Sequence, residues 1–165
     1  MATSSQGIVY EEYGKGMVTE EYNKLTTPVG GEYSLVLSDG TKGFLHADSE
    51  LKYPVEFSDG KRIVDLKGEA YFEVHKDSLR PFIVRMNGAE VTVLGTSFNV
   101  NTYGDDGQIY TTLVNGSVRV SSVKNGQAEV LKPGMQSVMD VQSGQLTVRE
   151  VDVEPYVAWR EGRFV

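Results

Sequence analysis

Turn dipeptides that contain glycine punctuate this sequence from residue 39 to residue 144. Asp-Gly or Asn-Gly pairs stand at 39–40, 59–60, 87–88, 115–116 and 125–126, and Gly-Asp, Pro-Gly and Ser-Gly pairs stand at 104–105, 133–134 and 143–144. Asn-Gly and Asp-Gly suit two-residue hairpin turns, in which the central residues have positive φ. These pairs divide the chain into segments that are too short for long helices. The spacing therefore predicts an all-β fold.

The segments between the turns alternate apolar and polar residues, as half-buried strands do. In residues 69–75 we expect Ala70, Phe72 and Val74 on one face, with Tyr71, Glu73 and His75 on the other. About a dozen short strands are predicted in a β-sandwich or a β-solenoid-like roll. They are placed at 33–37, 44–47, 55–57, 62–66, 69–75, 82–85, 91–94, 98–103, 110–114, 117–121, 129–131, 137–141 and 146–151. A short helix is expected only near the C-terminus, at 155–162, between Pro155 and Gly162.

Charge and composition exclude several classes of function. The net charge is −7, which opposes binding to a phosphate backbone, so no nucleic acid partner is expected. The chain has no cysteine, which removes disulfides and cysteine-based zinc sites. No segment approaches the roughly 20 consecutive apolar residues that a membrane-spanning helix needs.

Short motifs follow one another in a fixed order from Thr27 to Trp159. They are TPVG (27–30), LSDGT (37–41), ADSELKYP (47–54), RIVDLKGEAYFEV (62–74), PF (81–82), VLGTSFNV (93–100), LVNGSV (113–118) and LKPG (131–134). In this order and spacing the chain resembles the periplasmic FecR domain of anti-sigma regulators, in the form found in Bacteroidetes-type bacteria. It departs at GFLH (43–46), where His46 replaces an Asn that is common in the family. If that Asn has a role in the turn, the local geometry would differ here.

The resemblance implies a signal-relay domain of a single-pass inner-membrane protein. Its partners would be the N-terminal signalling domain of a TonB-dependent outer-membrane transporter and, through a cytoplasmic segment outside this chain, an extracytoplasmic-function sigma factor. Contact with the membrane would be made only by a helix preceding residue 1. Residues 1–24 would then be an N-terminal arm, made of an expression start (MATSSQ) and a membrane-proximal linker. Residues 25–150 would be the FecR-like β domain, and residues 151–165 would lead to a second periplasmic domain.

The resemblance also marks the bond between Gly95 and Thr96, because some relatives cut themselves at a Gly-Thr bond in this motif. The Thr96 hydroxyl would attack the Gly95 carbonyl, and water would then hydrolyse the resulting ester. The alternative, which we favour, is that Gly95 makes a bulge or tight bend between residues 91–94 and 98–100.

No other constellation points to catalysis, a metal or a cofactor, and we expect the domain not to be an enzyme. Glu69 and Glu73 would lie about 13 Å apart along one strand, too far for a carboxylate pair acting on one bond. His46 and His75 are the only imidazoles, and nothing in their spacing brings them together.

The C-terminal segment is rich in aromatic and arginine side chains, which are enriched at interface hot spots. The candidate partner-binding residues are Tyr156, Trp159, Arg160, Arg163 and Phe164. The alternative is that Trp159 caps the core.

Two rival functions stay open at this point. The tyrosine content would suit a carbohydrate-binding β-sandwich, which requires a row of exposed aromatic rings. A cupin-like metal oxygenase would need a His/Glu cluster, for which two histidines are too few.

Overall fold

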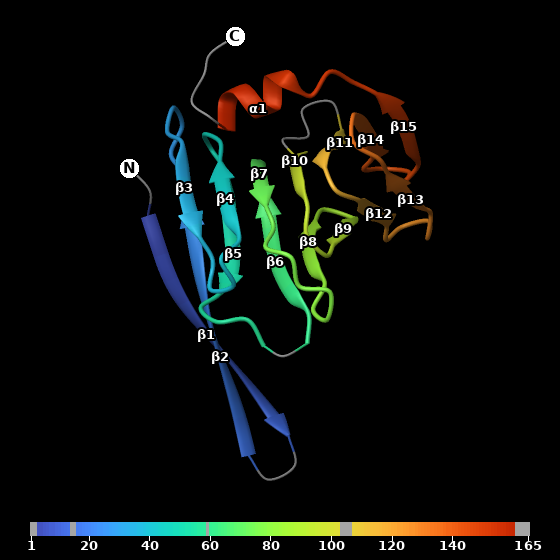
Figure 1. Ribbon diagram of the computed structural model, residues 1–165. Coiled ribbons are helices and arrows are strands. Elements are labelled where there is room, and N and C mark those ends of the chain that lie inside the picture. The colour runs from blue at the N-terminus through green and yellow to red at the C-terminus, as the bar shows by residue number, and fades with distance from the viewer. Residues whose placement is uncertain (1–2, 14–15, 59, 103–106, 161–165) are drawn as a thin grey trace.

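The structure is a computed structural model that describes residues 3–13, 16–58, 60–102 and 107–160, with side chains from residue 21 to residue 158 within those ranges. Two β-sheets face each other (Figure 1). Sheet A contains, in spatial order, β1 (Thr3–Tyr13), β2 (Gly16–Thr26), β5 (Glu50–Pro54), β6 (Arg62–Lys67), β8 (Phe82–Met86), β9 (Ala89–Val93), β12 (Val118–Ser122) and β13 (Ala128–Leu131). Sheet B contains β15 (Leu146–Glu150), β14 (Met135–Asp140), β11 (Gln108–Asn115), β10 (Ser97–Asn101), β7 (Glu69–Glu73), β4 (Lys42–Leu45) and β3 (Tyr33–Val36).

The chain advances along the sandwich in sequence order as it passes from one sheet to the other. Strand numbers rise steadily from β1 to β13 across sheet A and from β3 to β15 across sheet B. Neighbouring strands are antiparallel, except that β6 and β8 are parallel because β7 lies between them in the chain and belongs to sheet B. The prediction of an all-β sandwich or roll is confirmed, with 15 strands in the described residues.

The turn glycines adopt the conformation expected of them at most predicted hairpins. Gly40, which closes the β3–β4 turn, has φ 88°, and Gly116, between β11 and β12, has φ 97°. Asp59 and the pair 104–105 lie outside the described residues, so these two predicted turns are not described.

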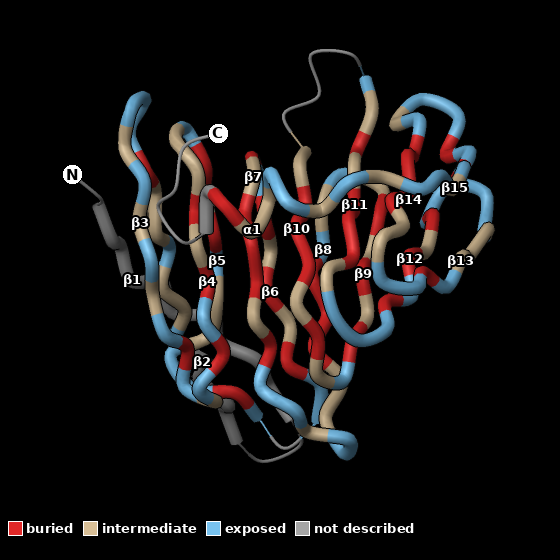
Figure 2. Tube along the Cα trace, turned by 45° about the horizontal axis from the view of Figure 1, so that its top comes forward, coloured by how far each residue is buried: buried red, intermediate tan, exposed pale blue. Residues whose placement is uncertain are grey.

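The core lies between the sheets and is aromatic at its centre. The Phe72 ring lies 5.9 Å from the Phe82 ring and 5.5 Å from the Phe98 ring, measured between centroids. All three side chains are fully buried. Rings in tilted packing at this separation stabilise a core beyond the area they bury. Figure 2 shows the buried residues concentrated along the central strands of both sheets.

One expected surface position is wrong. Tyr71 was placed on the polar face of its strand with Glu73, but it is only 1% exposed. The Phe44 ring packs edge-on against the Tyr71 ring at 6.2 Å between centroids, and the helix α1 (Glu154–Arg160) runs across the outer face of sheet B (Figure 2). A C-terminal helix is predicted at 155–162, and α1 begins at Glu154, one residue before Pro155. It is not long enough or apolar enough to span a membrane, and it is the one α-helix in the described part of the chain.

Two further segments differ from the expected strands. Residues 55–57 are irregular, and the strand lies instead at β5, which ends at Pro54. The arm expected at the N-terminus is a β1–β2 hairpin, and β2 pairs with β5 through residues 22–26. The arm is therefore continuous with sheet A.

Candidate functional site

A buried arginine organises one end of the sandwich. Arg62, the first residue of β6, is fully buried, and its Nη1 donates to Asp39 Oδ2 at 2.7 Å. Asp39 belongs to the LSDGT motif in the β3–β4 turn, where its carboxylate also accepts hydrogen bonds from the N–H and hydroxyl of Thr41. The ion pair therefore joins a turn of sheet B to a strand of sheet A.

The remaining Arg62 donors reach backbone carbonyls of two loops, the one between β7 and β8 and the one between β9 and β10. Nε donates to Arg80 O at 2.8 Å, Nη1 to His75 O at 2.8 Å, and Nη2 to Leu94 O at 3.2 Å. A longer bond of 3.4 Å joins Nη2 to Asp77 O. We call these residues, with Asp39 and Thr41, the Arg62 cluster. Because a buried guanidinium is costly unless all its donors are used, this arrangement fixes the loops it touches.

A second set of motif residues, the Thr27 cluster, lies near the start of β7. Thr27 Oγ1 donates to His46 O at 2.6 Å and accepts from Ser49 N at 2.9 Å. Ser49 Oγ in turn accepts from Glu69 N at 3.0 Å. Gly68 packs so closely that a Cβ there would lie 2.8 Å from Ser49 Cα. His46 contributes backbone groups to this cluster, because its N–H also donates to Glu69 O, so a histidine satisfies these contacts as well as an asparagine would.

The two histidines lie at opposite ends of β7. His46 Nε2 is 3.9 Å from Glu69 Oε1, and His46 Nδ1 is 3.8 Å from Glu32 Oε1. His75 follows the other end of β7 and is exposed. Positions 69 and 75 are six residues apart, which corresponds to about 20 Å of extended backbone. The structure thus does not bring the imidazoles together, and in the described residues no three His, Asp or Glu side chains are grouped closely enough to hold a metal ion.

Gly95 and Thr96 lie in the bend between β9 and β10. Thr96 Oγ1 donates to Ser117 O at 2.9 Å, and Thr96 O accepts from Val74 N at 2.8 Å. Gly95 does not have a positive φ. A glycine is needed there for space, because a Cβ would lie 2.8 Å from Lys76 Cα. The register between β10 and β11 also shifts at Ser97, two residues further on. A bend under steric constraint is therefore what the local structure contains.

The register aligns a row of side chains across the outer face of sheet B, and the helix α1 contacts this row at Gln136. The row runs through Phe44, Tyr71, Asn99, Thr112, Gln136 and Arg149. Gln136 Nε2 donates to Thr112 Oγ1 at 2.8 Å and to Tyr156 Oη at 3.1 Å. Ala158 is 1% exposed, so the helix is anchored at two points.

Of the candidate partner-binding residues, only Tyr156 has a described side chain. It is half-buried, and its hydroxyl accepts the Gln136 bond. Trp159 and Arg160 belong to α1, but their side chains lie outside the described ones. Arg163 and Phe164 lie outside the described residues altogether. Sequence reasoning missed Arg62, although a signal existed: Arg62, Val64 and Leu66 alternate along β6, which places all three side chains on the core face.

The tyrosines do not form an exposed row. Those with described side chains are buried or half-buried, and no aromatic residue is among the large exposed hydrophobic side chains of the described region. Flat rings available for stacking on a sugar are therefore not gathered on one described face.

Comparison with protein families and solved structures gives two findings. The family model described as FecR protein matches residues 23–119, a range that contains all residues of the Arg62 and Thr27 clusters. Two matching crystal structures are each of a candidate anti-sigma factor from Parabacteroides distasonis ATCC 8503. One, at 2.50 Å resolution, is 33% identical with a TM-score of 0.79 and covers 86% of this chain. The other, at 1.65 Å, is 34% identical with a TM-score of 0.77 and covers 84%. This chain spans 65% of the length of each. No curated protein matches.

Proposed function

Because this chain belongs to the FecR protein family, we propose that it is the periplasmic signal-relay domain of a membrane-anchored anti-sigma factor. The family match over residues 23–119 carries this proposal, and the likeness to two candidate anti-sigma factors supports it. The whole regulator holds an extracytoplasmic-function sigma factor through a cytoplasmic segment. The domain described here senses a TonB-dependent outer-membrane transporter by contact with its N-terminal signalling domain, without catalytic turnover.

The motif residues make contacts inside the fold, and this supports a role in protein–protein contact. Asp39 and Arg62 pair with each other inside the protein, and Thr27, Ser49 and Gly68 pack and bond to one another. Residues that are used in such internal contacts hold the fold together and are not available to bind a substrate. A signal-relay domain has to be rigid, because a close-packed interior transmits the strain that a docking partner causes.

The route of the signal follows sheet A. Eight strands connect β13 at one end with the β1–β2 hairpin at the other, and β2 bonds to β5 through residues 22–26. In the proposed regulator this hairpin precedes the body on the membrane side. A partner that docks on the sandwich and changes the packing of sheet A therefore changes the position of the arm.

Binding of the purified domain to the N-terminal signalling domain of a TonB-dependent transporter from the same organism tests this proposal. Isothermal titration calorimetry should show a saturable 1:1 complex, and a signalling domain from an unrelated transporter should bind at least about tenfold more weakly. In cells, deletion of this domain from the full-length regulator should uncouple a sigma-dependent reporter from the inducing signal. A domain that fails to bind, in a regulator whose reporter still responds after the deletion, would contradict the proposal.

A further inference from the structure

Four strands form the edges of the two sheets, and one of them lacks the usual protection. Edge strands of soluble proteins carry charges, prolines or bulges that prevent pairing with other chains. The sequence of β1 contains two glutamates, that of β13 contains Glu129, and that of β15 contains Arg149 and Glu150. The edge strand β3, Tyr-Ser-Leu-Val, contains no charge, no proline and no glycine. Among the described strands it pairs only with β4.

The register shows which backbone groups of β3 face away from β4. Leu37 N donates to Thr41 O at 2.8 Å, directly beyond the Val36–Lys42 pair. Residues along one strand of an antiparallel ladder alternate between bonding to the neighbour and facing away from it. Leu35 therefore bonds to β4, whereas Ser34 and Val36 direct their N–H and C=O groups outward. Both residues are exposed, and Val36 is 67% exposed.

We propose that the β3 edge binds an extended segment of the partner protein, which adds to sheet B as an eighth strand. This inference rests on the proposed function, since it names how the partner of the domain docks. The outward groups of Ser34 and Val36 supply main-chain hydrogen bonds, which give strand addition its affinity.

The charges at the two ends of β3 define the chemistry of the segment. Glu32, just before β3, has a side chain that is 51% exposed, and Lys42, opposite Val36, is also exposed. The complementary segment is uncharged in its middle. It carries a basic residue at the end that lies near Glu32 and an acidic residue at the end that lies near Lys42. A second copy of this chain on the β3 edge would instead protect the outward amides of Ser34 and Val36 in the free domain.

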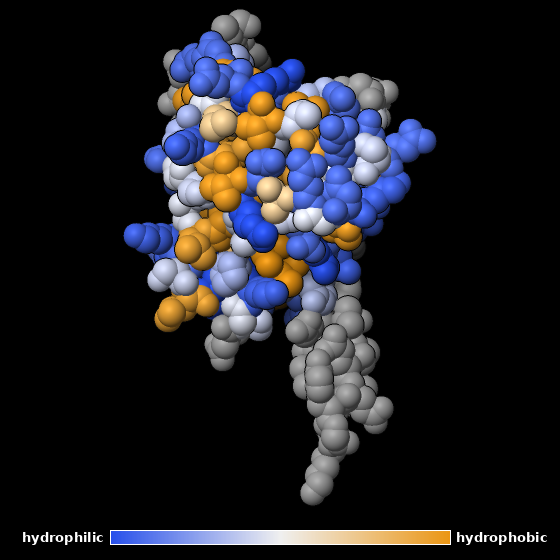
Figure 3. All heavy atoms as spheres, turned by 90° about the vertical axis from the view of Figure 1, so that its right-hand side faces the viewer, coloured by the Kyte–Doolittle hydropathy of each residue, from blue (hydrophilic) through white to orange (hydrophobic). Residues whose placement is uncertain are grey.

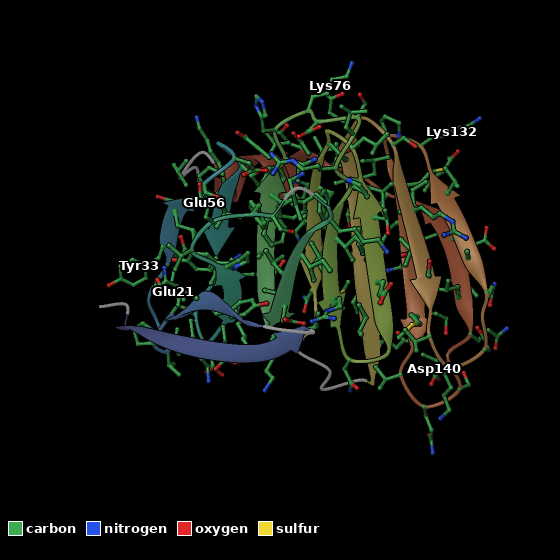
Figure 4. The ribbon with its side chains drawn as sticks, turned by 90° about the horizontal axis from the view of Figure 1, so that it is seen from below. Glu21, Tyr33, Glu56, Lys76, Lys132 and Asp140 are labelled. Carbon is green, nitrogen blue, oxygen red and sulfur yellow. The ribbon has the colours of Figure 1, made fainter. Side chains whose placement is uncertain are left out.

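The opposite end of the sandwich offers a matched control. Ser122 N donates to Gln127 O at 2.8 Å, so by the same alternation Val130 of β13 directs its N–H outward. Val130 is 62% exposed, close to the value for Val36. Tyr33, the first residue of β3, and Lys132, which follows β13, lie at opposite ends of the molecule (Figure 4). Figure 3 looks onto the β13–β15 end, where hydrophobic residues are interrupted by hydrophilic ones.

The test compares Val36→Pro with Val130→Pro in titrations with the signalling domain of the transporter. Proline at an outward edge position removes only an unpaired N–H, so both variants should fold, which their circular dichroism checks. Val36→Pro should weaken binding by about tenfold or more, and Val130→Pro should leave it within about twofold. Val36→Lys keeps the N–H but adds the charge that edges use as protection, and it should also weaken binding.

Amide exchange measured by NMR supplies the second readout. The Ser34 and Val36 amides should exchange fast in the free domain and slowly in the complex, whereas Leu35 and Leu37 should be slow in both. Unchanged exchange at Ser34 and Val36, or wild-type affinity of Val36→Pro, would overturn strand addition and leave the proposed function intact. If the wild-type domain does not bind the signalling domain, both proposals are overturned together.

Discussion

Arg62 and Asp39 form an ion pair whose side chains are 0% and 2% exposed, with 2.7 Å between Nη1 and Oδ2. A buried pair of this kind often adds little net stability, because both charges lose their hydration. Its value here is positional. The same guanidinium holds the carbonyls of His75, Arg80 and Leu94, so one side chain sets the relation between the β3–β4 turn and the loops that flank β8 and β10.

Replacement of Arg62 by methionine should destabilise the domain by about 3–5 kcal/mol, because it leaves the buried Asp39 carboxylate without its cation. Arg62→Lys should recover only part of this loss, since an ammonium cannot reach the several carbonyls that the planar guanidinium contacts. Urea denaturation measures both. The control is Arg85→Gln, which breaks an exposed pair with Asp65 and should cost less than about 1 kcal/mol. Equal losses for Arg62→Met and Arg85→Gln would refute the structural role of the cluster.

Gly68 is expected to be the turn glycine that least tolerates a side chain. Its φ is 101°, and a Cβ would lie 2.8 Å from the backbone of Ser49. Gly126 has φ 73° but open space around it. Gly126→Ala should therefore cost about 1–2 kcal/mol from backbone strain alone, and Gly68→Ala should cost clearly more. Thermal or urea unfolding of the two variants compares them, and a smaller loss for Gly68→Ala would show that the Thr27 cluster yields easily.

The alternation and the turn pairs were sufficient to predict the class of the fold, because both depend on local geometry. They could not predict which sheet face is covered from outside. Tyr71 has the period of a surface residue, yet it is buried, and the ring that packs against it, Phe44, belongs to another strand. Arg62 is the converse case. Its alternation with Val64 predicts that the Arg62 side chain faces the core. The carboxylate and carbonyl groups that pair with the buried guanidinium lie in turns and loops that only the complete fold brings together.

Candidate sites were predicted less well than strands for the same reason. The Gly95-Thr96 bond could be located from the motif, but its contacts with Lys76 and Ser117 arise between strands that are distant in the chain. The outward N–H groups of β3 depend on the register with β4, which the sequence of β3 alone does not determine.

The pKa of Asp77 should respond to Arg80. A hydrogen bond from the Arg80 side chain, and then one from the Leu79 N–H, lower the pKa of Asp77 below its ordinary value. A carboxyl with a lowered pKa stabilises the fold at pH above its ordinary pKa, and this contribution is lost as the pH falls through the lowered pKa. Arg80→Gln should raise the pKa of Asp77 toward the ordinary value and reduce the loss of stability in acid. An NMR titration of the Asp77 carboxyl carbon measures the shift, and identical titration curves in both proteins would contradict it.

The Gly95-Thr96 bond should remain intact in the purified domain. Attack on the Gly95 carbonyl requires the Thr96 hydroxyl to give up its proton to a base, but this hydroxyl donates to the Ser117 carbonyl, which is not one. The Thr96 carbonyl is also held by the N–H of Val74, which opposes the backbone movement that an N-to-O acyl shift needs. Intact-mass spectrometry after prolonged incubation should show a single full-length species, with Thr96→Ala as the uncleavable reference. Two fragments, residues 1–95 and 96–165, in the wild type and not in Thr96→Ala would establish cleavage and show that the bend can open.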